Sequence, residues 1–281
     1  MQAEKDIRST VAVISFSDTH ENHVYGLGPP VVKLRDGDEV RANPVRRELW
    51  GLWERYWEAA FRLTEGIPRV AVAMGDIVES DAKVRSPQDL VSLNPTDVFE
   101  QVTTTLDPVY AECDRVLTIR GTEAHVGKGA WQEEMIAQNY DHSIRDEKGN
   151  NASWWHFYGE FGGVLFDIAH HASMGSVRRN LSGAAGRLAY DVREAYVSDW
   201  GIKPPDLVLR AHNHRWADSG MTYPTRAVMV GCFQMKSTFV HRINKSYEMP
   251  NLGGLVTICD RGKYELHPIR VKPKGPKVWK I

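Results

Sequence analysis

The sequence of 281 residues predicts one α/β domain built on two packed β-sheets. In the first half, short apolar runs rich in β-branched residues alternate with amphipathic stretches, the pattern of parallel β-α units. In the second half, short apolar runs follow one another, which indicates a second and more antiparallel sheet. No linker-like stretch divides the chain, and a hydrophobic content of 42% can fill a sizeable core.

The elements of the first half follow from hydrophobic periodicity. Val11 to Phe16 is a buried strand by its composition, and the apolar residues of 45–63 recur at helical spacing. Asn94-Pro95 is a typical start for a helix over 96–111. Further strands are expected at 68–74 and 115–119, a helix at 131–140, and loop or hairpin excursions at about 26–44 and 80–95.

The second half is expected to be mainly strands. Pro204-Pro205 ends the helix expected over 181–200. Strands are expected at 153–158, 163–169, 206–211, 226–233, 254–259 and 264–271, with a turn at 146–151. The domain is therefore predicted to span 1–271, and 272–281 forms a basic C-terminal tail that is more simply solvated than bound to a nucleic acid.

Composition excludes several classes of protein. The formal net charge is -1, which argues against a basic nucleic-acid coat or an acidic solvating tail. The three cysteines are widely spaced and form no C-x-x-C pair, so we expect neither a disulfide framework nor a thiolate zinc site. The first residues are charged rather than apolar, and no apolar run approaches the roughly 20 residues of a membrane span. We expect a cytoplasmic protein with no membrane partner.

Candidate functional residues lie in five short segments that follow predicted strands. The segments are Asp18-Thr-His20, Gly75-Asp76, Gly121-Thr-Glu-Ala-His125, His170-His171 and His212-Asn-His214. The carboxyl ends of strands are where open α/β sheets place their sites. In an extended segment, residues two apart point to the same side, so Asp18 and His20 are expected to converge, as are His212 and His214.

The chemistry of these side chains indicates a metal centre. Each segment alone is weak, because a lone histidine at a strand end is more often structural than a ligand. Together they offer imidazoles and carboxylates without cysteine, a donor set that suits zinc, manganese or iron. Two such ions about 3.5–4 Å apart form a clamp for displacement at phosphorus.

The order of these motifs resembles that of the calcineurin-like metallophosphoesterases over about residues 11–216. The resemblance implies a four-layer α-β-β-α sandwich of two mixed β-sheets flanked by helices. It implies two divalent metal ions (Mn, Fe or Zn, with Mn favoured for assays) and attack on phosphorus by a hydroxide that bridges them. By position, Asp18, His20 and His214 would hold one ion, His170 and His212 the second, and Asp76 both.

One motif departs from the family pattern. The family has Gly-Asn-His followed by an acid, where the asparagine is a metal ligand and the histidine the proton donor. Here the histidine comes two residues late, at His125, and Val126 stands where the acid would be. We predict His125 as the proton donor or a phosphate contact. Glu123 is slightly favoured over Thr122 for the place of the asparagine, and His171 competes with His170 as a ligand.

The predicted reaction is hydrolysis of a phosphodiester, by a nuclease or a nucleotide phosphodiesterase, so the partner would be a phosphoester and, in the nuclease branch, a nucleic acid. A compact chain with a Gly-Thr-x-x-His loop resembles phage or prophage members, which favours the nuclease slightly. A protein or small-molecule phosphomonoesterase and a non-catalytic metal-binding scaffold of the same fold are the alternatives. Arg178, Arg179 and Trp216 are candidate substrate contacts, and Glu79 either supports a ligand or only ends a loop. The sequence predicts no oligomeric state.

Overall fold

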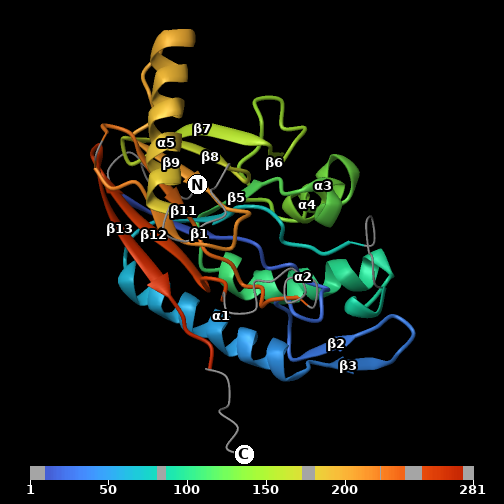
Figure 1. Cartoon of the computed structure of the whole chain (residues 1–281). Coiled ribbons are helices and arrows are strands. Elements are labelled where there is room, and N and C mark those ends of the chain that lie inside the picture. The colour runs from blue at the N-terminus through green and yellow to red at the C-terminus, as the bar shows by residue number, and fades with distance from the viewer. Residues whose placement is uncertain (1–9, 81–86, 173–180, 222, 238–248, 275–281) are drawn as a thin grey trace, which may run out of the picture.

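The computed structural model describes residues 10–80, 87–172, 181–221, 223–237 and 249–274. Two mixed β-sheets pack face to face, and helices cover their outer faces (Figure 1). The predicted α/β fold with two flanked sheets is therefore confirmed. None of the helices in the described ranges is long and apolar enough to cross a membrane.

The first sheet has six strands in the order β13-β12-β1-β4-β5-β6. They are β1 (Thr10–Phe16), β4 (Arg69–Ala73), β5 (Arg115–Ile119), β6 (Ser153–Trp154), β12 (Gly253–Asp260) and β13 (Lys263–Arg270). Strands β1, β4, β5 and β6 run parallel, as expected for β-α units. Strand β12 pairs antiparallel with β1, so the last two strands return to the first sheet instead of extending the second.

The second sheet has five strands in the order β10-β11-β9-β8-β7. They are β7 (His156–Phe161), β8 (Val164–Ala169), β9 (Leu207–Arg210), β10 (Ala217–Asp218) and β11 (Arg226–Met229). The strand expected over 153–158 is split at Trp155, because the chain leaves the first sheet as β6 and enters the second as β7. Strands β8, β9 and β11 are parallel, so the sheet is mixed rather than mainly antiparallel.

Helices α1 (Pro44–Leu63) and α2 (Pro95–Tyr110) cover the outer face of the first sheet, and each begins at an asparagine cap followed by proline. Helix α4 (Trp131–Gln138) also packs against this sheet, beside β5. Helix α5 (Leu181–Glu194) covers the second sheet through small residues and continues into a π-helical turn, Ala195–Asp199. The 26–44 excursion contains a hairpin of β2 (Val31–Lys33) and β3 (Glu39–Arg41), and the 80–95 excursion contains the short helix η1 (Pro87–Asp89).

The core between the sheets consists mainly of aliphatic and aromatic side chains from both, such as Val13, Val72, Phe166 and Leu209. A second core lies between the first sheet and helices α1 and α2. With apolar layers on both sides, the parallel strands are held rigidly, and the polar segments at their carboxyl ends share one edge of the sandwich.

Candidate metal centre

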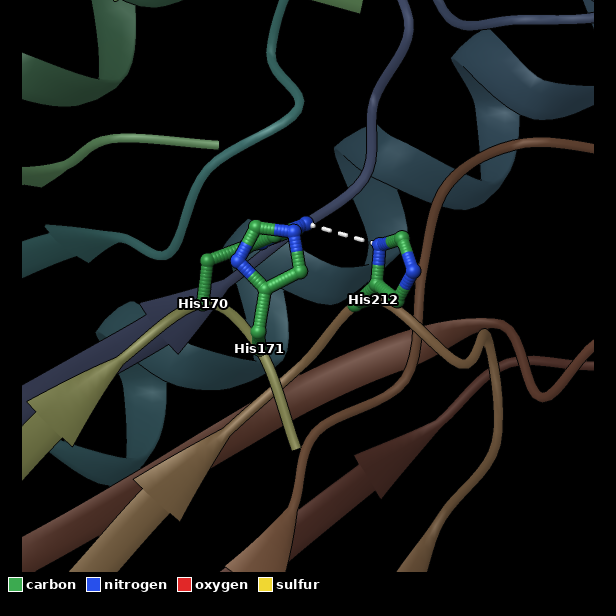
Figure 2. Close-up of side chains that lie close together, drawn as sticks. All are labelled: His170, His171 and His212. Atoms are coloured by element: carbon green, nitrogen blue, oxygen red, sulfur yellow. Dashed lines mark hydrogen bonds between the residues drawn. The ribbon is translucent and has the colours of Figure 1, made fainter. Parts of the chain in front are cut away.

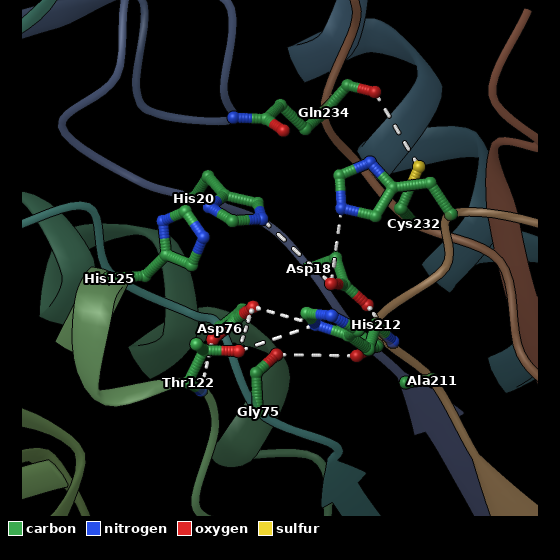
Figure 3. Close-up of polar contacts among 12 residues, drawn as sticks. Asp18, His20, Gly75, Asp76, Thr122, His125, Ala211, His212, Cys232 and Gln234 are labelled. Atoms are coloured by element: carbon green, nitrogen blue, oxygen red, sulfur yellow. Dashed lines mark hydrogen bonds and ion pairs between the residues drawn. The ribbon is translucent and has the colours of Figure 1, made fainter. Parts of the chain in front are cut away.

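The polar segments that follow β1, β4, β8 and β9 meet at one point between the two sheets (Figure 3). Four overlapping groups of potential ligand atoms lie there among the described residues, with the atoms of each group within 4.8 Å of one another. One of them joins His20 with Glu79 and His125, and another joins His171 with His170 and His212. We call Asp18, His20 and His214 the first ligand group. Asp76, His170 and His212 form the second ligand group, and Asp18 also lies within reach of it.

Left-handed backbone, rather than extended strand, aims these side chains. Positive φ angles occur at Asp18 (51°), His20 (43°), Asp76 (52°), His212 (69°) and His214 (53°). The expectation that Asp18 and His20, or His212 and His214, converge through strand alternation is therefore wrong. Each strand ends before its motif, and tight turns direct the side chains. Non-glycine residues rarely adopt such angles, and backbone strain of this kind clusters at functional sites.

Two glycines allow the loops after β4 and β5 to approach each other. A Cβ added at Gly121 would lie 2.2 Å from the Asp76 nitrogen, and one at Gly75 would lie 2.7 Å from His170 Nδ1. Both distances are too short for any side chain. Glycine at these positions therefore lets Asp76 and His170 occupy the same small space.

The first ligand group is enclosed by protein. Asp18 has no exposed surface, and the His20 residue is 2% exposed. His214 Nε2 lies 3.2 Å and His20 Nε2 lies 3.8 Å from Asp18 Oδ1. Burial alone would raise the pKa of Asp18, but the neighbouring imidazoles hold it well below its ordinary value. The carboxylate is therefore ionised.

The atoms of the first ligand group fit a metal ion. Asp18 Oδ1 and His20 Nε2 are buried without a hydrogen-bond partner. Unpaired buried polar atoms are costly, and in native proteins they call for an ion or a water. His20 Nδ1 lies 2.9 Å from a carboxylate oxygen of Glu79, which can only accept, so Nδ1 carries the proton and the Nε2 lone pair is free.

The second ligand group has the spacing of a coordination site. Asp76 Oδ2 lies 3.0 Å from His170 Nε2 and 3.7 Å from His212 Nδ1, and the two ring nitrogens are 3.2 Å apart. Ligands about 2.1 Å from one ion at tetrahedral angles lie about 3.4 Å apart. His170 Nδ1 donates to the Met74 carbonyl at 2.6 Å, which again frees Nε2.

His125 stands beside the first ligand group. Its Nδ1 lies 2.9 and 3.0 Å from the two oxygens of Glu79, and its ring centroid is 4.7 Å from that of His20. Burial of Glu79 acts to raise its pKa, but the bonds to His125 and His20 lower it to about 2. Glu79 is thus a carboxylate that orients a ligand and the predicted proton donor at once, and it does more than end a loop.

The loop that departs from the family pattern contains a short helix, α3 (Glu123–Val126), and not an extended turn. Thr122 takes the position beside the second ligand group. Its nitrogen donates to Asp76 Oδ1 at 2.6 Å and its hydroxyl to Asp76 Oδ2 at 3.2 Å. Glu123 is exposed, accepts from the Gly129 nitrogen at 2.8 Å and belongs to no ligand group of the described residues. The preference for Glu123 as the replacement ligand therefore finds no support, because α3 directs this side chain away.

Glu133 on α4 is a site residue that sequence reasoning missed. It is fully buried, and its two oxygens accept from the Gly121 nitrogen at 2.6 Å and the Ile77 nitrogen at 3.1 Å. It thereby joins the loop that carries Asp76 to the loop that carries Thr122. The only sequence signal was an acidic pair on a predicted helix, which is common on solvated faces.

The candidate substrate contacts have different outcomes. Trp216 packs against the core between the sheets, and the Arg270 guanidinium lies 5.0 Å from its ring centroid, which favours a structural role. Arg178 and Arg179 lie outside the described residues. The described ligands define a candidate dinuclear centre without either contact.

No family model matches this chain, and no curated protein matches it by sequence. Among solved structures, Vacuolar Protein Sorting 29 from Cryptosporidium parvum aligns at 11% identity and a TM-score of 0.40, over 95% of this chain and 100% of that one. Vps29 from Chaetomium thermophilum aligns at 10% identity and 0.35, over 94% and 100%. A 5'-nucleotidase from Candida albicans aligns at 11% identity and 0.37, over 79% of this chain and 45% of that one. Likeness at this level assigns no activity or partner to this chain.

Proposed function

We propose that this protein is a dinuclear metal-dependent phosphoesterase of the calcineurin-like class that hydrolyses phosphodiesters. One observation carries the proposal: two groups of ligand atoms, drawn from the ends of four strands, meet at the buried carboxylate Asp18, and the second group also contains the buried carboxylate Asp76. A purely structural cluster of histidines would not leave Asp18 Oδ1 and His20 Nε2 buried and unpaired.

The residues divide the chemistry among them. Asp18, His20 and His214 would hold one ion, and Asp76, His170 and His212 would hold the other, with Asp18 within reach of both. The family pattern would have Asp76 contact both ions. When bound, the ions supply positive charge for the phosphoryl oxygens and lower the pKa of water toward neutrality. The buried ring nitrogens and carboxylates keep bulk water from competing for these positions.

His125 would protonate the leaving oxygen. Since the Glu79 carboxylate accepts at Nδ1, the proton to be transferred sits on Nε2, the other ring nitrogen. The side chain is 33% exposed, so a substrate can reach it, while Glu79 at 14% is more enclosed. Glu79 therefore fixes the orientation of the His125 ring.

The charge of the site favours an anionic substrate. Two divalent ions bring four positive charges against the two carboxylates Asp18 and Asp76, and Glu123 points away from both groups. The surplus attracts phosphate despite the formal net charge of -1 on the chain. Within this class we favour a nuclease or a nucleotide phosphodiesterase in the cytoplasm. A phosphomonoesterase remains the alternative substrate class.

The test is hydrolysis of a chromogenic phosphodiester by purified protein with added manganese. Asp76→Asn should abolish turnover, whereas Asp141→Asn, an exposed carboxylate outside both groups, should leave it unchanged. Turnover by metal-free protein, or full turnover by Asp76→Asn, would overturn the mechanism. A panel of single-stranded DNA, double-stranded DNA, cyclic nucleotides and phosphomonoesters then separates the substrate branches.

Elemental analysis of the same preparation distinguishes the enzyme from the non-catalytic scaffold. The enzyme should hold about two ions per chain, and a scaffold that has lost the centre should hold none. The altered loop at Gly121–His125 is the observation that favours the scaffold. The other ligands, which the described residues bring together in both groups, favour the enzyme.

A further inference from the structure

An additional imidazole lies beside two members of the second ligand group. The nitrogens of His170, His171 and His212 lie within 4.8 Å of one another. Figure 2 shows the three rings around one space, with ring centroids 4.7 Å apart for His170 and His171 and 4.7 Å apart for His171 and His212. Adjacent residues of a strand point to opposite faces, but β8 ends at Ala169. The bend at His170 therefore lets both histidines face the site.

Thr122 marks the point on which these donors converge. Its hydroxyl oxygen lies 3.0 Å from His171 Nε2, 3.3 Å from His212 Nδ1 and 3.2 Å from Asp76 Oδ2. A threonine hydroxyl has one proton to donate and is a weaker ligand than a neutral imidazole. Thr122 can therefore position Asp76, but a nitrogen donor is still needed where the family pattern has an asparagine oxygen.

We propose that His171 supplies the missing donor, so that the second ion is held by Asp76 and three imidazoles and is selected as zinc. This inference rests on the dinuclear centre proposed above and concerns the identity of its second ion. Three nitrogens and one carboxylate oxygen suit zinc in a tetrahedral site, whereas manganese prefers oxygen donors. The first ligand group has one carboxylate, Asp18, and two imidazoles, so it offers a larger share of oxygen donors and discriminates less.

The exposure of His171 agrees with this role and makes it testable. The His170 side chain is fully buried and fixed by the Met74 carbonyl, whereas the His171 ring is exposed and its recorded hydrogen bond is to Thr122. Replacing an exposed ring should not unfold the protein. His171→Ala removes the donor, and His171→Asn offers an amide oxygen in its place.

The experiment is competition of the apoprotein against a chromophoric chelator, with zinc and separately with manganese. Wild type should bind two zinc ions. His171→Ala should lose the weaker one or bind it more than about tenfold less tightly. His171→Asn should lower the ratio of zinc to manganese affinity at that site by about tenfold or more. His142→Ala, whose ring belongs to neither ligand group, should match wild type.

Cobalt supplies a second readout that does not depend on activity. Tetrahedral cobalt absorbs visible light strongly, so the second equivalent should give an intense band in wild type that is lost in His171→Ala. Either of two results would overturn this inference and leave the dinuclear centre intact. One is that His171→Ala binds two zinc ions with wild-type affinity. The other is that Thr122→Val loses the second ion while His171→Ala keeps it. If wild type binds manganese but no zinc, this inference fails and the proposed function stands, whereas binding of neither ion would overturn the proposed function itself.

Discussion

In the first ligand group, Asp18 has no exposed surface and the His20 and His214 side chains are 3% and 27% exposed. In the second, the His212 side chain is 37% exposed, and the neighbouring His171 is open to solvent. Glu79 fixes the His20 ring in the first group, and His214 is close to the buried thiol of Cys232. In the second group, only His170 is fixed in this way, by a backbone carbonyl. The fold therefore builds one half of the centre rigidly and leaves the other half adjustable and nearer to substrate.

The largest expected effect comes from Asp18, because it contributes to both halves. Its Oδ1 faces the rings of His20 and His214, and its Oδ2 accepts a hydrogen bond from the backbone nitrogen of His212 at 3.1 Å. Asp18→Asn should bring metal content below one ion per chain and lower kcat by on the order of a thousandfold or more. The His212→Gln variant should keep about one ion per chain, because the residues of the first ligand group are unchanged in it.

Elemental analysis and kcat on the chromogenic diester would measure this contrast. If Asp18→Asn and His212→Gln lost the same amount of metal, the two ligand groups would not bind their ions separately. The contrast between a rigid and an adjustable half would then be wrong. Asp141→Asn serves as the matched control, since it removes an exposed carboxylate of the same kind.

The next effect concerns proton transfer beside the rigid half. His125→Asn should lower kcat by about 10²–10⁴-fold on a diester with an alkoxide leaving group, because general acid catalysis has about this magnitude. On a nitrophenyl diester, whose leaving group needs no proton, the loss should be small. Metal content should stay near the wild-type value, because Asp18, His20 and His214 would still hold the neighbouring ion without His125. A loss of the same size on both substrates would contradict the assignment of His125 as proton donor.

A smaller effect is expected at Glu133, which joins the two loops behind the second group. Both its oxygens accept backbone N–H groups, and an amide of the same shape has only one acceptor. Glu133→Gln should weaken binding of the second ion by about tenfold and leave the first nearly unchanged. Chelator competition would measure both constants, with the exposed Glu147→Gln as control. If Glu133→Gln weakened binding of both ions equally, Glu133 would not act specifically on the second ligand group.

The sequence predicted those site residues whose position depends only on the local pattern of strands and the polar residues that follow them. Strand ends are visible in sequence, so Asp18, Asp76, His170 and His212 could be assigned to one edge of the fold. The role of Glu133 could not, because it depends on where a helix docks against two loops. Likewise, the pairing of β12 with β1 depends on long-range register, which the alternation of apolar residues does not encode.

His171 shows a second kind of limit. In a regular strand it would point away from His170, and only the bend after Ala169 brings both rings to the same side. Glu123 shows the reverse, since a carboxylate in the right part of the motif is directed away by one turn of helix. Spacing in sequence predicts convergence only where the backbone conformation is known.

The smallest effect tests how the second sheet anchors the adjustable half. Asp167 on β8 is buried and pairs with Arg210, the last residue of β9, with His156 at 2.9 Å and with the Tyr196 hydroxyl at 2.8 Å. This network lies just before His170 and His212 in the chain. Burial acts to raise the pKa of Asp167, but its partners lower it from 3.8 to about 2.

A carboxyl group whose pKa is lower in the folded than in the unfolded protein stabilises the folded state at any pH above the unfolded-state pKa. This stabilisation is lost as the pH falls from the unfolded-state pKa to the folded-state pKa. In EDTA, wild type should therefore lose stability between pH of about 4 and 2, by up to about 2 kcal/mol from this group. Asp167→Asn should be less stable at pH 5 and should lack this part of the acid dependence. Urea unfolding at each pH measures both, and Asp141→Asn should keep the wild-type slope. If Asp167→Asn also keeps the wild-type dependence of stability on pH, the ion pair does not stabilise the ends of β8 and β9. The second ligand group would then be held in place only by its bound ions.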